Sequence, residues 1–163
     1  MMEITGRPDY YLEPGHVCFS ASPLVIRTVL GSCVIVCLWD EELRHGGAAH
    51  FSRPWARTPE TATPHYGNAA TIALIRAMEA AGSRVENLVA QLAGGASPDS
   101  PDKNDVGMAN VAAAQRMLHR KGIPIASEDV GGTMGRKIVF DTHTGHLVVL
   151  KVHRVRESDW TAD

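Results

Sequence analysis

The sequence is poor in several features that would place a protein in a class at once. It has three cysteines among 163 residues, without the spacing of a metal site, and so few cysteines favour reduced thiols in a cytosol over a disulfide framework. It has no long basic run and a formal net charge of −2, so nothing in it indicates a nucleic-acid-binding surface. No internal repeat or low-complexity tract is visible.

Signals for membranes and secretion are missing as well. The longest apolar run, Val34 to Trp39, is far too short to span a bilayer. The first residues, Met1 to Arg7, lack the basic-then-apolar profile of a signal peptide. We therefore expect no membrane insertion and a cytoplasmic location.

No motif demands a cofactor. A glycine-rich phosphate loop ending in Lys-Ser or Lys-Thr is missing, and so is a pair of histidines at helical metal-ligand spacing. His143 and His146 share one turn, but no carboxylate or cysteine completes a ligand set, and a solvated turn is expected there. We expect neither a metal ion nor an organic cofactor.

What is present fits one globular domain with a real core. The chain is 44% hydrophobic and 21% charged, and no stretch looks like an interdomain linker. We expect a single domain over residues 1–163, whose tail, 156–163, is either disordered or laid against the surface.

Residue patterns predict strands that are interrupted by two main helices. Strands are expected at 34–39, 46–51, 88–93, 123–127, 137–141 and 146–152. Two of the turns join antiparallel neighbours, so the predicted fold is a single-domain α/β layered sandwich of mixed, largely antiparallel sheets. Residues 53–66, with three prolines, are expected to form an exposed loop.

The two helices have recognisable ends. The first is expected over 69–81, with Asn68 as its N-cap and Gly82 as its stop. The second is expected to begin after Asp105 as N-cap and to end at Gly122. Its inner face is expected to carry Val106, Val111, Ala114, Met117 and Leu118.

A cysteine and a histidine are the best evidence for catalysis. Cys33 follows a glycine turn and precedes an apolar strand, and His50 comes seventeen positions later. A thiol needs a base to become a thiolate at neutral pH, and an imidazole is the usual partner. In a hairpin, Cys33 at the start of one strand can face His50 at the end of the next. Taken alone, however, the pair is more often explained by core packing.

The other two cysteines provide a comparison within the chain. Cys18 and Cys37 have apolar neighbours and no adjacent glycine, so both are expected to be packing residues. Only Cys33 has a turn that could lift its sulfur out of the core.

Together, the motifs resemble those of the chemoreceptor glutamine deamidases of bacterial and archaeal chemotaxis, the CheD family. The resemblance covers roughly residues 10–152, and its specific part is Thr-x-Leu-Gly-Ser-Cys with the histidine motif behind it. The matching segments are Tyr11–Gly15, Thr28–Val34, Gly46–Phe51, Tyr66, Leu92–Ala96, Gly107 with Asn110 and Val111, Asp129–Gly132, and Gly135–Lys137. The segments Ser52-Arg53 and Ser97-Pro98 depart from the pattern and would affect receptor preference more than activity.

The resemblance implies hydrolysis of specific glutamine side chains of methyl-accepting chemoreceptors to glutamate. Cys33 would be the nucleophile, His50 its base, and Thr28 a third member that orients His50 or the substrate. The alternative for Thr28 is a β-branched strand residue. The resemblance also implies a CheC-type phosphatase as a partner.

Several further residues are candidates for substrate or oxyanion binding. Backbone N–H groups around Ser32 and Cys33 are expected to stabilise the oxyanion, because the Gly31 turn leaves them unpaired by neighbours. Tyr66 either brackets the substrate glutamine or fastens the loop to the first helix. Asp129 is expected to lie in an ordinary turn, and the role of Arg136 is left open.

Two other functions are compatible with the sequence. A thiol amidase with another protein substrate would use the same Cys33–His50 pair. A non-catalytic adaptor that binds chemoreceptors and the phosphatase is the second alternative, and the presence of both residues argues against it.

Overall fold

Nine strands and two α-helices follow one another along the part of the chain that the computed structural model describes, residues 7–97 and 105–153. The strands are β1 (Asp9–Tyr11), β2 (His16–Ser20), β3 (Val25–Leu30), β4 (Val34–Asp40), β5 (His45–Phe51), β6 (Leu88–Gly94), β7 (Ile125–Val130), β8 (Gly135–Asp141) and β9 (Leu147–Val152). The α-helices are α1 (Gly67–Ala80) and α2 (Val106–Arg120), and two short 3₁₀ turns, η1 (Pro59–Thr61) and η2 (Val85–Asn87), lie before and after α1. The predicted tail, 156–163, and most of the loop before α2 lie outside the described residues, so the single domain over 1–163 stays a prediction.

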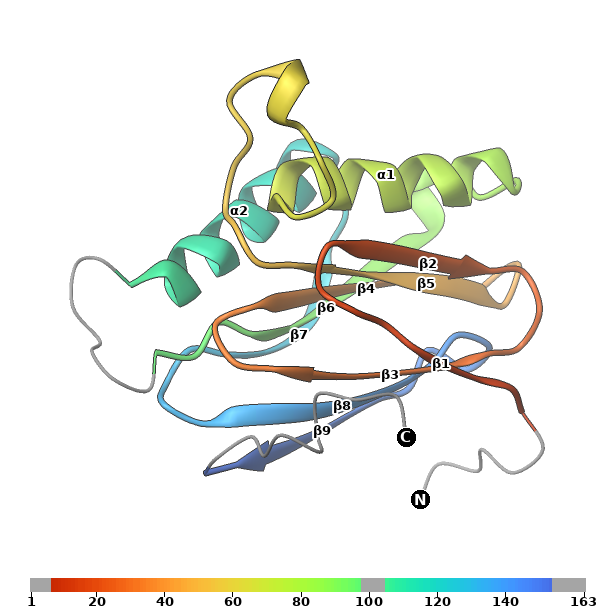
Figure 1. Cartoon of the computed structure of the whole chain (residues 1–163). Helices are drawn as coiled ribbons and strands as arrows, with labels where there is room; N and C mark the ends of the chain where they lie inside the picture. The colour runs from red at the N-terminus through yellow and green to blue at the C-terminus, as the bar shows by residue number, and fades with distance from the viewer. Residues whose placement is uncertain (1–6, 98–104, 154–163) are drawn as a thin grey trace.

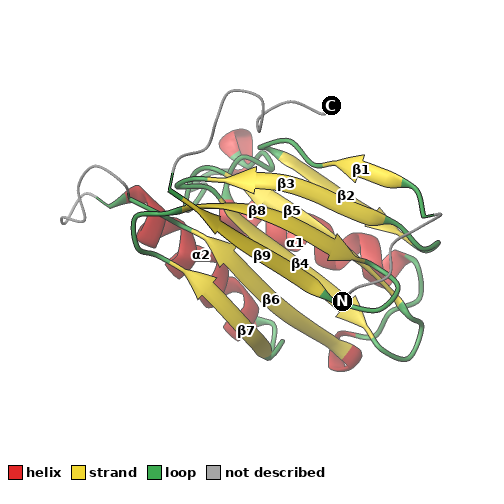
Figure 2. Cartoon of the chain, turned by 90° about the horizontal axis from the view of Figure 1, so that it is seen from below, coloured by secondary structure: helices red, strands yellow, loops and turns green. Residues whose placement is uncertain are grey.

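The strands form two sheets, and the helices cover one of them. The five-stranded sheet has the order β2-β5-β4-β6-β7, and the four-stranded sheet has the order β1-β3-β8-β9. Figure 1 shows three layers, with α1 and α2 on one side of the five-stranded sheet and the four-stranded sheet on its other side. In Figure 2 the strands of both sheets run in nearly the same direction, with the helices behind them. The predicted α/β layered sandwich of mixed sheets is confirmed.

Two separate cores follow from this order of layers. One lies between the helices and the five-stranded sheet and contains residues such as Val36, Leu74 and Val111. The other lies between the two sheets and contains Ile26 and Ile35 among others. The run of apolar residues in β4 is continuous because this central strand is buried on both faces.

The predicted hairpin around the candidate pair is confirmed. Strand β4 pairs antiparallel with β5, in a register that sets Val34 opposite Phe51. Strands β8 and β9 form the second predicted hairpin. Both β1 and β7 pair in parallel at sheet edges, and this makes each sheet mixed.

Two details of the helices differ from the expectation. Helix α1 begins at Gly67 with Tyr66 in the N-cap position, while the Asn68 side chain bonds both backbone groups of Ala56 instead, at 2.8 and 3.0 Å. In α2, Asp105 caps the helix as predicted by accepting from the Met108 N–H, but Val106 is 45% exposed. Asn110 takes one of the inward positions, although polar residues are not counted by an apolar pattern.

Candidate active site

The three predicted catalytic side chains project into the layer between the two sheets. Successive side chains of a strand point to opposite faces. Thr28 comes two positions after Ile26, which is part of the core between the sheets, and so its side chain points to the same face. His50 shares a face with Ala48 for the same reason, and the half-buried Cys33 packs against this core.

Strand register brings Cys33 and His50 close to each other. His50 lies directly opposite Ile35, and Cys33 lies two positions before Ile35. Cys33 and His50 are therefore diagonal neighbours. Such positions are about 7–8 Å apart, a distance within reach of an aromatic side chain such as that of histidine. This register places both side chains on one face of the sheet, and the meeting of thiol and imidazole stays a prediction.

The imidazole of His50 is held from the four-stranded sheet. Its Nδ1 lies 3.0 Å from the Thr28 Oγ1 and 3.2 Å from the carbonyl oxygen of Leu12, which directly follows β1. The Thr28 hydroxyl in turn donates to the same Leu12 carbonyl, at 2.6 Å. All three groups are buried, so water does not compete for these bonds.

This network determines which ring nitrogen of His50 carries the proton. The Leu12 carbonyl can only accept, and the single hydroxyl hydrogen of Thr28 is used in the bond to that carbonyl. The Nδ1 of His50 must therefore be the N–H that donates to both oxygens, and Nε2 carries the lone pair. Within the described residues, the buried Nε2 has no hydrogen-bond partner, the Cys33 sulfur included, so its lone pair is the one left to accept a proton.

Replacement of Thr28 by valine tests the contribution of the hydroxyl. Valine has the same shape but removes one hydrogen bond to Nδ1, while the Leu12 carbonyl still accepts the Nδ1 proton. We expect a five- to tenfold lower kcat, on the order of 1 kcal/mol, rather than the ~10⁴-fold loss that follows the wrong tautomer. Full activity of Thr28→Val would reduce Thr28 to a packing residue.

Burial keeps both members of the pair neutral at rest. Desolvation raises the pKa of the Cys33 thiol to about 11. Desolvation is also the main reason why the pKa of His50 falls to about 4, with the bond to Leu12 opposing it and His16 adding to it. At neutral pH the site therefore contains a thiol and a neutral imidazole, so a thiolate would form here only if the thiol gave up its proton.

The lowered pKa of His50 predicts a loss of stability in acid. A neutral histidine is favoured in the folded chain, so its contribution is complete above the unfolded value of 6.5 and is lost as pH falls through 6.5 towards 4. We expect the free energy of unfolding to decrease by about 3 kcal/mol across this range. Urea denaturation at several pH values would measure it, with His50→Gln as the control that lacks this titration. Equal acid sensitivity of both proteins would contradict the assignment.

The turn before β4 has its carbonyls occupied and its amides open. The carbonyls of Gly31, Ser32 and Cys33 accept from the Ala96 N–H at 3.0 Å, the Asn110 Nδ2 at 3.0 Å and the Gly95 N–H at 2.9 Å, respectively. Among the described residues, no acceptor binds the N–H of Ser32 or Cys33. Free backbone N–H groups at a turn are the kind of donor that the oxyanion of a proposed acyl transfer would require.

Close packing of α2 against the same region requires glycines. A Cβ on Gly107 would lie 2.4 Å from the carbonyl oxygen of Gly95, and one on Gly94 would lie 2.2 Å from that of Cys33. Gly94 and Gly95 also adopt φ values of +111° and +74°, which favour glycine. These contacts place the N-terminal half of α2 directly behind the cysteine turn.

The remaining predicted site residues lie around this turn. A Cβ on Gly31 would meet no heavy atom within 4 Å, so the space beside it is open. Tyr66 directly precedes α1 and forms a parallel bridge with Arg53, three residues after His50. A bridge of this kind would fasten the loop to the helix. The substrate-binding roles of Gly31, Ser32 and Tyr66 stay predictions.

The buried Arg136 pairs with the partly exposed Asp129 and links the two sheets. Asp129 lies in β7 and not in a turn, so that interpretation of its position is wrong. Arg136 is 2% exposed, and its side chain shares a face with Ile138 between the sheets. It pairs with Asp129 at 3.1 Å and donates to the carbonyls of Gly94 and Gly131.

Two residues that hold the site were not assigned a role from the sequence. The Leu12 carbonyl is a backbone group, so no side-chain pattern could have identified it. In the sequence, Asn110 appeared only as part of a motif. The available signal was its inward position on a helix, because a buried asparagine there must find hydrogen-bond partners.

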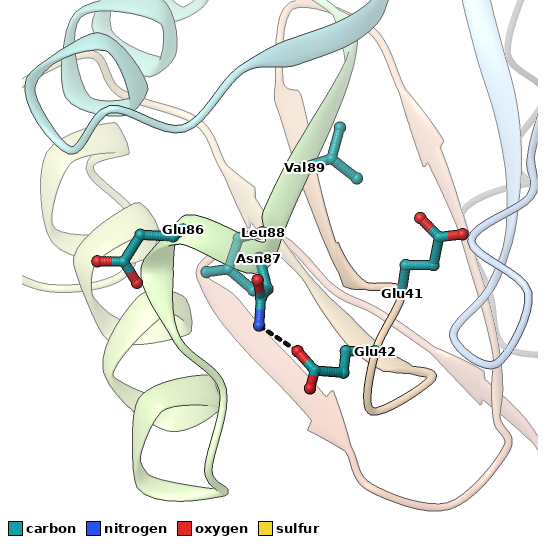
Figure 3. A pocket seen from close by; sticks show the side chains of 6 residues that line it. All are labelled: Glu41, Glu42, Glu86, Asn87, Leu88 and Val89. Atoms are coloured by element: carbon teal, nitrogen blue, oxygen red, sulfur yellow. Dashed lines mark hydrogen bonds between the residues drawn. The ribbon is translucent and has the colours of Figure 1, made fainter.

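Two hollows of the described surface lie away from the candidate pair. Figure 3 shows one of about 490 Å³, rich in carboxylates, in which Asn87 donates to Glu42 at 2.7 Å; it is lined by Glu41, Glu42, Glu86, Asn87, Leu88 and Val89. It lies at the far end of β4, about 20 Å from Cys33 along the strand. Among the described residues, no group of three or more His, Cys, Asp or Glu is placed to hold a metal ion, and no helix is long and apolar enough to cross a membrane.

Comparison with known proteins gives consistent similarities. A family model described as "CheD chemotactic sensory transduction" matches residues 52–151. A protein of Sulfurimonas denitrificans is 38% identical over 88% of this chain and 94% of its own, and one of Trichlorobacter lovleyi is 40% identical over 91% and 95%. A protein of the archaeon Methanococcus vannielii is 34% identical over 89% and 96%. Each is named "probable chemoreceptor glutamine deamidase CheD".

Proposed function

The chain belongs to the CheD family, and from this membership we infer that it hydrolyses glutamine side chains of chemoreceptors to glutamate and ammonia. It is thus a hydrolase of side-chain amides that acts in chemotaxis. We further propose that it does so through a covalent thioester on Cys33, with His50 as the proton carrier and Thr28 as the residue that orients His50.

One observation carries the proposed mechanism. The Nδ1 of His50 is tied to Thr28 and Leu12, while its buried Nε2 has no partner among the described residues and lies on the side of the sheet that Cys33 shares. An imidazole held in this tautomer beside a thiol is the arrangement that base-assisted nucleophilic attack needs.

The reaction proceeds in two halves. The Cys33 sulfur attacks the carboxamide carbon while its proton moves to His50 Nε2, and a C–S bond forms as the C=O becomes an oxyanion. When the oxyanion collapses, the C–N bond breaks and His50 gives its proton to the nitrogen, which leaves as ammonia. A water molecule then loses a proton to Nε2 and attacks the thioester. Cleavage of the C–S bond returns the thiol and releases glutamate.

The oxyanion is stabilised by the open amides of the cysteine turn. The Ser32 and Cys33 N–H groups stand next to the attacking sulfur and have no acceptor within the described residues. Loss of one such donor typically costs ~3–4 kcal/mol of barrier.

Mass analysis of a chemoreceptor cytoplasmic fragment tests the function and the nucleophile together. In heavy-oxygen water, the wild-type protein should convert defined glutamines to glutamates that carry one heavy oxygen atom. Cys33→Ala should convert none, while Cys18→Ala, which removes a half-buried thiol from the same core, should match the wild type. Conversion by Cys33→Ala at the wild-type rate would disprove the role of Cys33.

Two other readings are separated by the same measurement. If neither protein modifies the receptor fragment, a thiol amidase with another protein substrate becomes the better function. If Cys33→Ala also retains full signalling in cells, a non-catalytic adaptor is favoured. We propose in addition that the protein acts at the cytoplasmic helical region of the receptors and that a CheC-type phosphatase binds it, and co-purification with each partner would test this.

A further inference from the structure

Asn110 ties together the two strand ends that carry the catalytic pair. It lies on the inner face of α2 and is fully buried. Its Nδ2 donates to the carbonyl of Ser32 at 3.0 Å and to that of Ser52 at 3.2 Å. Ser32 directly precedes Cys33, and Ser52 comes two residues after His50. One amide group therefore connects the start of β4 with the end of β5.

The orientation of this amide is determined by its surroundings. Carbonyl oxygens can only accept, so the nitrogen of Asn110 must face both of them. The Oδ1 atom is then left buried and, within the described residues, without a partner. An unpaired buried acceptor destabilises the fold. A buried amide that keeps one polar atom unpaired while it holds the peptide of the proposed nucleophile points to a role in the reaction.

The bond from Asn110 also sets the direction of the Cys33 N–H. The Ser32–Cys33 peptide is trans, so its C=O and N–H point in opposite directions. The Ser32 carbonyl points to α2, on the helix side of the five-stranded sheet. The Cys33 N–H is consequently turned away from α2, towards the side on which the Cys33 and His50 side chains lie.

We propose that Asn110 is a positioning residue for deamidation, which fixes the Ser32–Cys33 peptide so that the Cys33 N–H faces the oxyanion of the substrate. This role rests on the proposed function. Asn110 touches neither the substrate nor the sulfur, and it acts through the one peptide group that it holds. The same bond leaves the acidity and the accessibility of the thiol unchanged.

The test compares a reaction that forms an oxyanion with one that does not. Alkylation of Cys33 by iodoacetamide displaces iodide at a saturated carbon, so it needs the sulfur and His50 but no oxyanion donor. In Asn110→Ala and in the bulkier Asn110→Leu, we expect kcat for deamidation to fall about 10- to 100-fold, with KM within about threefold and the alkylation rate within about twofold. Thr71→Val removes another buried, unpartnered polar atom, on α1, and should leave all three values unchanged.

Each outcome decides a different question. An unchanged kcat, or an alkylation rate that falls in proportion to kcat, would overturn the proposal, because Asn110 would then support the thiol or only the fold. If one variant does not fold, as shown by its melting curve, the other provides the measurement. If the wild type does not deamidate the receptor fragment, the proposed function fails instead. A peptide aldehyde with glutamate semialdehyde in place of glutamine then serves as the probe, because its hemithioacetal on Cys33 places oxygen at the oxyanion position. Weaker aldehyde binding by Asn110→Ala would support the proposal, and equal binding would overturn it.

Discussion

The His50→Ala variant is expected to deamidate about 10⁴-fold more slowly than the wild type at pH 7. Burial raises the pKa of Cys33 to about 11, so without a base only a very small fraction of the thiol is ionised at neutral pH. Because hydroxide then supplies the only route to the thiolate, the rate of the variant should rise about tenfold for each pH unit. The wild-type rate should stay flat over the same range. Initial rates on a receptor fragment between neutral and alkaline pH would measure both.

His45 provides a matched control for this variant. It is also buried and on β5, but its Nε2 is bonded to the Ser83 hydroxyl at 2.8 Å, and it lies at the other end of the strand. His45→Ala should lose stability while keeping the flat pH dependence of the wild type. A flat profile for His50→Ala, or a steep one for His45→Ala, would remove His50 from the proposed mechanism.

The Arg136→Met variant is expected to lower the free energy of unfolding by about 3–5 kcal/mol. Its guanidinium is buried between the sheets and donates to the carbonyls of Gly94, Gly131 and Met134, besides pairing with Asp129. Methionine fills similar space but leaves these oxygens without their donor. Urea denaturation monitored by tryptophan fluorescence would measure the change. Deamidation should weaken as well, because Gly94 packs against the carbonyl of Cys33.

Lys151 is the control for the buried guanidinium of Arg136. Its ammonium also pairs with Asp129, at 3.3 Å, but the side chain is 50% exposed. Lys151→Met should therefore change the free energy of unfolding by less than about 1 kcal/mol. Similar losses in both variants would mean that burial of the Arg136 guanidinium contributes little.

Local patterns were sufficient to predict the hairpin that carries the candidate pair. The apolar run of β4, the charged turn after it and the glycine-rich β5 together indicated antiparallel strands, and the register confirms this. The Asp105 cap of α2 was predictable because an N-cap depends only on adjacent residues. Cys37 was correctly expected in the core, whereas Cys18 is only half-buried because β2 lies at the edge of its sheet.

Contacts between distant segments account for what the sequence did not predict. Asn68 bonds Ala56 across the preceding loop, and this tertiary contact replaces its expected role as a cap. Neither the Leu12 carbonyl nor the bond from Asn110 to Ser32 follows from spacing, since each depends on how separate layers pack. The tautomer of His50 likewise could not be predicted from the sequence, because the groups that fix it belong to the second sheet.

The anchoring of His50 from the opposite sheet makes chemical reactivity a late product of folding. Thiol and imidazole belong to neighbouring strands of one sheet, but the groups that orient the imidazole belong to the other. Strand β3, which carries Thr28, lies between β1 and β8 in its sheet. It can pair with β8, Gly135–Asp141, only after that segment has been synthesised. A nascent chain that ends before this point contains both reactive residues without an oriented base. We therefore expect incomplete chains of the protein not to react with other amides around them.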